Sequence, residues 1–94
     1  MNIVHNKTFS FELKDILKYI ATDKPSASLK FKDELKLKIR EIPANPYKYK
    51  QSLYFDDKNM RDMTYKTYTI VYEVNFEKDS IEILKIFNRN KPKQ

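Results

Sequence analysis

Two groups of basic side chains are the residues of this sequence whose types and spacing could do chemistry. In the first group two lysines alternate with tyrosines and an arginine follows, at Lys48, Lys50 and Arg61. A cation can hold a phosphate while an aromatic ring beside it stacks on a base, as in single-strand nucleic-acid binding. A loop that packs its tyrosines against the protein would have the same composition, so both interpretations stay open.

The second group is the C-terminal tail, which from residue 85 onward carries no acidic side chain. Its basic residues are Lys85, Arg89, Lys91 and Lys93. Such a run either contacts an anionic surface, such as RNA or an acidic protein segment, or is a solvated end. The 94-residue chain has 19 Lys and Arg against 13 Asp and Glu, a net charge of +6, so we expect anionic partners.

Several kinds of site are excluded or disfavoured by composition. Cysteine and glycine are absent, which excludes disulfides, thiolate zinc sites and Gly-rich phosphate loops. His5 is the single histidine, which disfavours a multi-histidine metal site and a Ser–His–Asp triad. We therefore expect no metal and no cofactor. No apolar run approaches the roughly 18 residues of a membrane span, so we expect a cytoplasmic protein without a membrane partner.

Two amphipathic helices precede Lys48, Lys50 and Arg61 in the chain and must help to position them. Apolar residues recur at helical spacing over residues 9–20, where Ser10 is the expected N-cap. A second helix is predicted over residues 26–42, ended by Pro43. The short connection around Pro25 predicts an antiparallel helical hairpin.

Strands are predicted at residues 2–7, 61–65, 67–76 and 81–87. One face of the third strand collects Tyr68, Ile70, Tyr72, Val74 and Phe76. The fourth is apolar on both sides and should be central, with Ile81, Ile83 and Phe87 opposite Leu84 and Ile86. The order β-α-α-β-β-β predicts one α+β domain over residues 1–94, in which the helical hairpin packs on a mostly antiparallel sheet.

Three parts of the chain resemble the ParE/RelE superfamily of type II toxin–antitoxin toxins. The helix junction is similar in YIATDKPSASLKF (19–31), and the loop after the second helix in NPYKYKQS (45–52). The paired last strands are similar in RDMTYKTYTIVYEV (61–74) and IEILKIF (81–87). The superfamily contains ParE-type poisons of DNA gyrase and RelE-type ribosome-dependent mRNA endonucleases. The long helical hairpin resembles the ParE branch.

The resemblance also implies roles for the basic residues. Cations surround the scissile phosphate in the RelE branch, and the corresponding positions here are Lys48, Lys50, Arg61 and Arg89. RelE-type nucleases usually end with a catalytic tyrosine or histidine, and this tail has neither. The resemblance therefore implies a ParE-like growth inhibitor that binds DNA gyrase. Its candidate contact residues are Lys48, Lys50, Arg61, Lys85, Arg89 and Lys91.

Two alternatives to a gyrase inhibitor stay open, and the expected target differs between them. A RelE-like endonuclease would act on mRNA at the ribosome, and an inactivated relative would bind only its antitoxin. In every case the resemblance implies a small cognate antitoxin. An antitoxin segment would cover an apolar groove or add a strand to the sheet.

Overall fold

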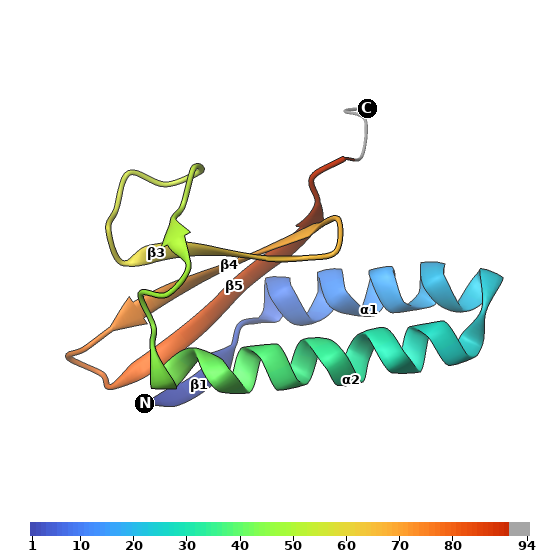
Figure 1. Cartoon of the computed structure of the whole chain (residues 1–94), viewed down its shortest axis with the longest axis horizontal. Coiled ribbons are helices and arrows are strands. Elements are labelled where there is room, and N and C mark those ends of the chain that lie inside the picture. Colours follow the sequence, from blue (N-terminus) through green and yellow to red (C-terminus); the bar gives the residue numbers. More distant parts are fainter. Residues whose placement is uncertain (91–94) are drawn as a thin grey trace.

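The computed structural model describes residues 1–90, which form two helices and one five-stranded sheet (Figure 1). The elements are β1 Asn2–His5, α1 Lys7–Asp23, α2 Pro25–Glu41, a 3₁₀ turn Ile42–Ala44, β2 Lys50–Gln51, β3 Met60–Tyr65, β4 Tyr68–Asn75 and β5 Ser80–Asn88. The predicted α+β architecture is confirmed. The two-residue strand β2 is an addition that was too short to show a period in the sequence.

Helix α1 starts earlier than predicted, because Asn6 is its N-cap. Its side-chain oxygen accepts a hydrogen bond from the Phe9 amide at 2.8 Å, so Ser10 was the wrong choice of cap. Helix α2 has Pro25 in its first turn, as expected. The Ser28 hydroxyl donates to the Leu17 carbonyl at 2.8 Å and links the two helices of the hairpin.

The sheet has the order β1-β5-β4-β3-β2, with β1 parallel to β5 and the other pairs antiparallel. Strand β5 is therefore internal, as its two apolar sides predicted. Tyr72 pairs with Ile83 and Val71 with Lys85, so Leu84 is an extra residue that forms a β-bulge.

The bulge changes which side chains of β5 reach the helices. Beyond it Ile86 lies in the same core as Ile81 and Ile83, so its predicted place on the opposite face was wrong. Phe76 was also misplaced, because it lies in the turn after β4 and is exposed.

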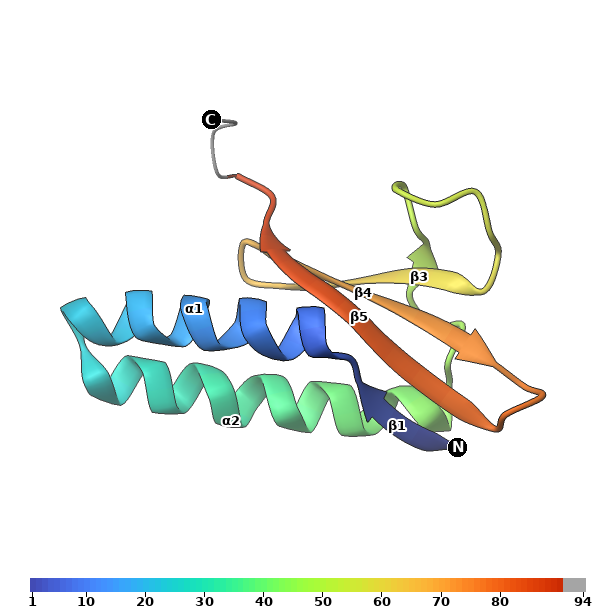
Figure 2. The same cartoon turned by 180° about the vertical axis from the view of Figure 1, so that it is seen from behind.

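The main core lies between the helical hairpin and one face of the sheet, as Figures 1 and 2 show. Its helical side contains Phe9 of α1 and three buried apolar side chains of α2, Phe31, Leu35 and Ile39. The Phe31 ring meets Tyr65 and Tyr68 edge-on, with ring centres 5.1 and 5.2 Å away. On the other face of the sheet residues 52–59 fold over Asp62 and Phe87, and Met60 and Val71 are buried.

Two turns have left-handed backbone without glycine. Lys66, between β3 and β4, has φ 56°, and Asp79, between β4 and β5, has φ 50°. The Cβ atom of every residue except glycine makes this region costly, although Asp tolerates it better than Lys. The β3–β4 turn therefore holds local strain that the flanking strands must offset.

Candidate functional site

Two of the predicted cations share the face of the sheet that the 52–59 loop covers. Residues directly paired across strands lie on the same face, and the pairing forms the row Lys50, Asp62, Val71 and Lys85. Strands lie about 4.8 Å apart, so the two lysines are roughly 14 Å apart along this row. Lys50 is exposed and Lys85 is half-buried, with its Nζ 5.6 Å from the centre of the Phe87 ring.

Asp62 lies in the middle of this row and is buried. One of its carboxylate oxygens accepts a hydrogen bond from the Leu53 amide at 3.0 Å. The other oxygen has no hydrogen-bonding partner among residues 1–90. The Ser52 hydroxyl accepts from the Tyr54 amide at 3.1 Å. A buried carboxylate and a serine therefore hold the start of the 52–59 loop on the sheet.

Arg61 fastens two loops together. Its Nε donates to the Lys58 carbonyl at 2.9 Å, and one terminal nitrogen donates to the Tyr49 carbonyl at 3.1 Å. The guanidinium carbon also lies 4.7 Å from the centre of the Tyr47 ring. Two of the five N–H donors that this arginine could offer a phosphate are therefore used within the protein.

Arg89 lies at the opposite end of the strands. Its backbone amide donates to the Thr67 carbonyl at 3.0 Å, and its side chain donates to the Lys66 carbonyl at 3.4 Å. Lys66 is five residues beyond Arg61, which at about 3.3 Å per residue is roughly 17 Å along the strands. The structure does not bring these two arginines together.

The remaining predicted cations are solvent-facing or outside the described part of the chain. Lys48 is exposed in the loop after α2, with its Nζ 5.6 Å from the Tyr49 ring. Tyr49 packs on the core, whereas Tyr47 stays partly exposed beside Phe76. Lys91 lies outside the residues that the structure describes. The loop after α2 thus packs Tyr49 against the protein, whereas the ring of Tyr47 stays accessible.

The buried tyrosine hydroxyls near these cations are poor proton acceptors. Burial and a hydrogen bond to Glu34 raise the pKa of Tyr65 to about 12. Burial likewise raises the pKa of Tyr72 above its usual range, and its hydroxyl donates to the Pro46 carbonyl at 2.6 Å. Both hydroxyls stay protonated near neutral pH, so neither is suited to act as a general base. Across residues 1–90 no cluster of His, Asp and Glu could hold a metal ion.

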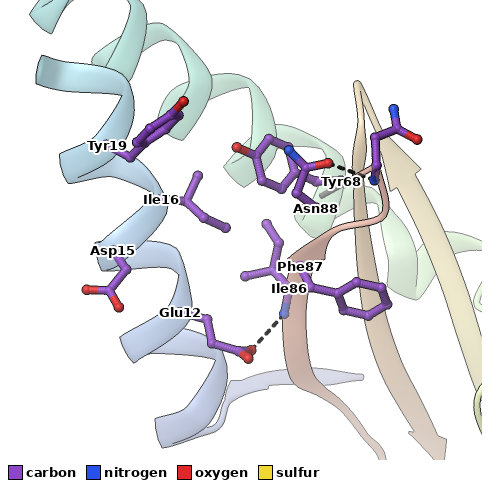
Figure 3. Close-up of a pocket in the computed structure, with 9 residues that line it drawn as sticks. Glu12, Asp15, Ile16, Tyr19, Tyr68, Ile86, Phe87 and Asn88 are labelled. Atoms are coloured by element: carbon purple, nitrogen blue, oxygen red, sulfur yellow. Dashed lines mark hydrogen bonds between the residues drawn. The ribbon is translucent and has the colours of Figure 1, made fainter. Parts of the chain in front are cut away.

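A groove of about 560 Å³ lies between α1 and the end of β5 (Figure 3). It is lined by Glu12, Asp15, Ile16, Tyr19, Tyr68, Ile86, Phe87, Asn88 and Asn90. Glu12 accepts a hydrogen bond from the Ile86 amide at 3.0 Å. No pattern in the sequence indicates this groove, because its walls come from segments that are far apart in the chain.

Exposed apolar side chains form a second kind of surface. Leu53, Tyr54 and Phe55 are consecutive and exposed in the first half of the 52–59 loop, Leu53 by 74%. The Tyr54 ring meets Phe87 at a right angle, with centres 5.1 Å apart. Three adjacent exposed apolar side chains are typical of a surface that contacts another molecule.

A comparison with protein families identifies the proteins to which this chain is related. The model of a family described as "ParE toxin of type II toxin-antitoxin system, parDE" matches residues 3–92. The chain belongs to the ParE toxin family. The preference for the ParE branch, based on the helix junction and the long hairpin, is confirmed.

A solved structure agrees with this ParE assignment at the level of the fold. The structure titled "Chromosomal ParDE TA system from P. aeruginosa" superposes with a TM-score of 0.74. The match covers 94% of this chain and 95% of that chain, at 15% sequence identity. A comparison with curated protein sequences gives no match. Neither helix of this ParE-family chain is long and apolar enough to cross a membrane, within residues 1–90.

Proposed function

We propose that this ParE-family chain is a cytoplasmic toxin that arrests growth by binding a target protein and is neutralised by a small antitoxin. DNA gyrase is the target that the ParE resemblance implies. The observation that carries the choice of binding over cleavage is the separation of Arg61 and Arg89. A nuclease needs preorganised cations that converge on one phosphate, together with a group that transfers a proton. Here one arginine ties loops together and the other lies at the far end of the strands.

The face of the sheet beneath the 52–59 loop is our candidate for contact with the target. The exposed Leu53, Tyr54 and Phe55 provide apolar area, and Lys50 and Lys85 flank the same face. An apolar centre with a polar, charged rim is the usual arrangement of a protein–protein interface. Lys48, Arg89 and Lys91 would add positive charge that speeds association with an acidic partner.

Inducible expression of the chain in bacteria tests this function. We expect growth to stop with DNA-damage signalling, and a co-expressed cognate antitoxin to restore growth. Replacing Leu53 and Phe55 together by serine should weaken the arrest at least ten-fold in inducer requirement. Leu29→Ser and Leu37→Ser, which remove comparable exposed apolar area from α2, are the matched control and should leave it unchanged.

The alternatives give different outcomes in the same experiment. Codon-phased cleavage of mRNA on translating ribosomes, lost in both Arg61→Ala and Arg89→Ala, would make the chain an endonuclease. The control Arg40→Ala removes an exposed arginine of α2 and should have no effect. Normal growth with folded, soluble protein in the cell would instead identify an inactivated relative.

A further inference from the structure

Helix α1 presents its basic and its acidic side chains in different directions. Lys14 lies seven residues after Lys7, and Lys18 follows four residues later, so the three lysines share one side of the helix. Glu12 and Asp15 instead line the groove next to β5. The lysine side of α1 is therefore distinct from the acidic side that faces the end of the sheet.

Helix α2 brings a second row of basic side chains next to the first. Lys32, Lys36 and Arg40 follow one another at four-residue intervals, so they also share one side of their helix. Lys14 of α1 and the two lysines of this row line a hollow between the helices. Because the buried stripe of α2 faces the sheet, the two rows lie on the solvent side of the helical hairpin (Figure 1).

The two rows together form a surface with an excess of positive charge. We call it the basic face, and its residues are Lys7, Lys14, Lys18, Lys32, Lys36 and Arg40. All six are exposed, and the one ion pair within residues 1–90 joins the N-terminal amine to Asp79 at 3.8 Å. Asp33, three residues before Lys36, adds one acid beside the α2 row. A surface of this charge attracts polyanions.

The dimensions of the basic face match duplex DNA. An α-helix rises about 1.5 Å per residue, so the α1 and α2 rows extend over roughly 16 and 12 Å, about four or five phosphate steps of ~3.4 Å each. Packed helices lie roughly 8–10 Å apart, and the minor groove of B-DNA is about 6 Å wide. Long basic side chains on two packed helices therefore reach the phosphates on both sides of one minor groove.

Other extended anionic surfaces fit the basic face less well. The minor groove of duplex RNA is wide and shallow, so its two phosphate backbones are farther apart than the two rows. A helix that lies on a membrane inserts a broad apolar side into the lipid. In this chain the apolar stripes of both helices pack into the core against the sheet. Duplex DNA is therefore the occupant that both shape and composition favour.

We propose that the basic face of the helical hairpin binds duplex DNA through its phosphates, without reading the base sequence. Contacts to phosphates position a protein on DNA but carry no sequence information. DNA binding of this kind is independent of growth arrest, because the basic face and the 52–59 loop lie on opposite sides of the sheet. One molecule therefore has both surfaces free for contact at the same time.

Fluorescence anisotropy of a short labelled DNA duplex, titrated with the purified full-length chain, measures this binding. We expect a dissociation constant of about 10⁻⁶–10⁻⁴ M at physiological salt, the range of non-specific DNA binding. With about four phosphates neutralised, the logarithm of the binding constant should fall with the logarithm of the salt concentration at a slope of about −3.6, so that tripling the salt weakens binding roughly fifty-fold. Two duplexes of unrelated sequence should bind equally well.

Charge variants locate the contact on the hairpin. Lys14→Gln with Lys36→Gln removes one cation from each row, so the steepness of the salt dependence should fall by about 1.8. Lys58→Gln with Lys78→Gln removes the same charge from two exposed lysines outside the hairpin. This control pair should leave the slope unchanged, and the circular dichroism of both pairs should match that of the unmodified chain.

NMR of the labelled, unmodified chain with the same duplex gives a second, independent location. Amides near Lys14 and Lys36 should shift most, and larger shifts at Leu53 and Phe55 would overturn the proposal. An equal loss of salt dependence in the two pairs of variants would also overturn it. Tighter binding of a duplex RNA of the same sequence, or of vesicles containing phosphatidylserine, would identify RNA or a membrane as the occupant instead.

Discussion

The two faces of the sheet are stabilised in different ways. On the helix-covered face Phe31, Leu35 and Ile39 interlock with apolar side chains of β3, β4 and β5. On the loop-covered face one buried carboxylate, Asp62, holds the start of an irregular segment through the Leu53 amide. The first arrangement distributes stability over many contacts, and the second concentrates it in a few hydrogen bonds. We therefore expect changes on the first face to unfold the domain and changes on the second to release the loop.

The largest effect should come from the helix-covered face. Leu35 is buried to 1% exposure in the centre of α2, so Leu35→Ala should lower the free energy of unfolding by about 2–5 kcal/mol. The loss combines the transfer of the side chain and the cavity left behind. Denaturant unfolding followed by circular dichroism measures it. Leu37→Ala, on the exposed side of the same helix, should change stability little, and an equal loss there would show that the two sides are not distinct.

Asp62 is the corresponding position on the loop-covered face. Asp62→Ala should cost about 1–3 kcal/mol, because the Leu53 amide loses its buried acceptor. Hydrogen exchange should rise within residues 52–59 while the helices keep their protection. Asp62→Asn retains an acceptor and should lose less. Loss of protection throughout the domain would mean that both faces unfold as one unit.

The hydrogen bond between Tyr65 and Glu34 joins the sheet to α2. Tyr65→Phe should cost about 0.5–1.5 kcal/mol at neutral pH. The folded-state pKa of Tyr65 is about 12, raised from 10.0, so stability from this group is complete below pH 10 and declines as pH rises toward 12. Unfolding measured from pH 9 to 11.5 should therefore show a shallower decline in the variant. An unchanged slope in Tyr65→Phe would show that Tyr65 does not contribute to the pH dependence of stability.

The smallest change in stability should come from the turn between β3 and β4, which contains Lys66. Lys66→Gly should stabilise the protein by about 0.5–1 kcal/mol, because glycine accepts φ 56° without steric cost and this outweighs its greater unfolded-state entropy. Thermal unfolding compares it with Asp79→Gly, which should gain less. A loss of stability in Lys66→Gly would show that the lysine side chain, 5.7 Å over the Tyr65 ring, outweighs the strain.

The helix-covered face was predictable because its signal is periodic and local. The stripes of α1 and α2 and the alternation of β4 lie within one element each, and the structure confirms them except at Phe76. The cap at Asn6 was missed because Ser10 also suits that role. The bulge at Leu84 was missed because register depends on the partner strand, and it moved Ile86 to the other face.

The candidate sites were less predictable than the fold, because they depend on contacts between residues that are distant in the chain. The sequence identified Lys50, Arg61 and Arg89 as cations but not what each contacts. That Arg61 donates to two loop carbonyls depends on how residues 45–60 fold back on β3. The burial of Asp62 and the groove beside Glu12 arise from residues distant in the chain. A single sequence carries no pairing information of that kind.

The pairing of β1 with β5 has a consequence for how the protein is made. Asn2 and its partner Ser80 are 78 residues apart in the chain, and Asn2 is synthesised first. Joining strands so distant in the chain carries a large loop-closure entropy and slows folding. While translation proceeds, the helical hairpin can form locally, but β1 has no strand to join. The sheet is therefore completed only after β5 has left the ribosome.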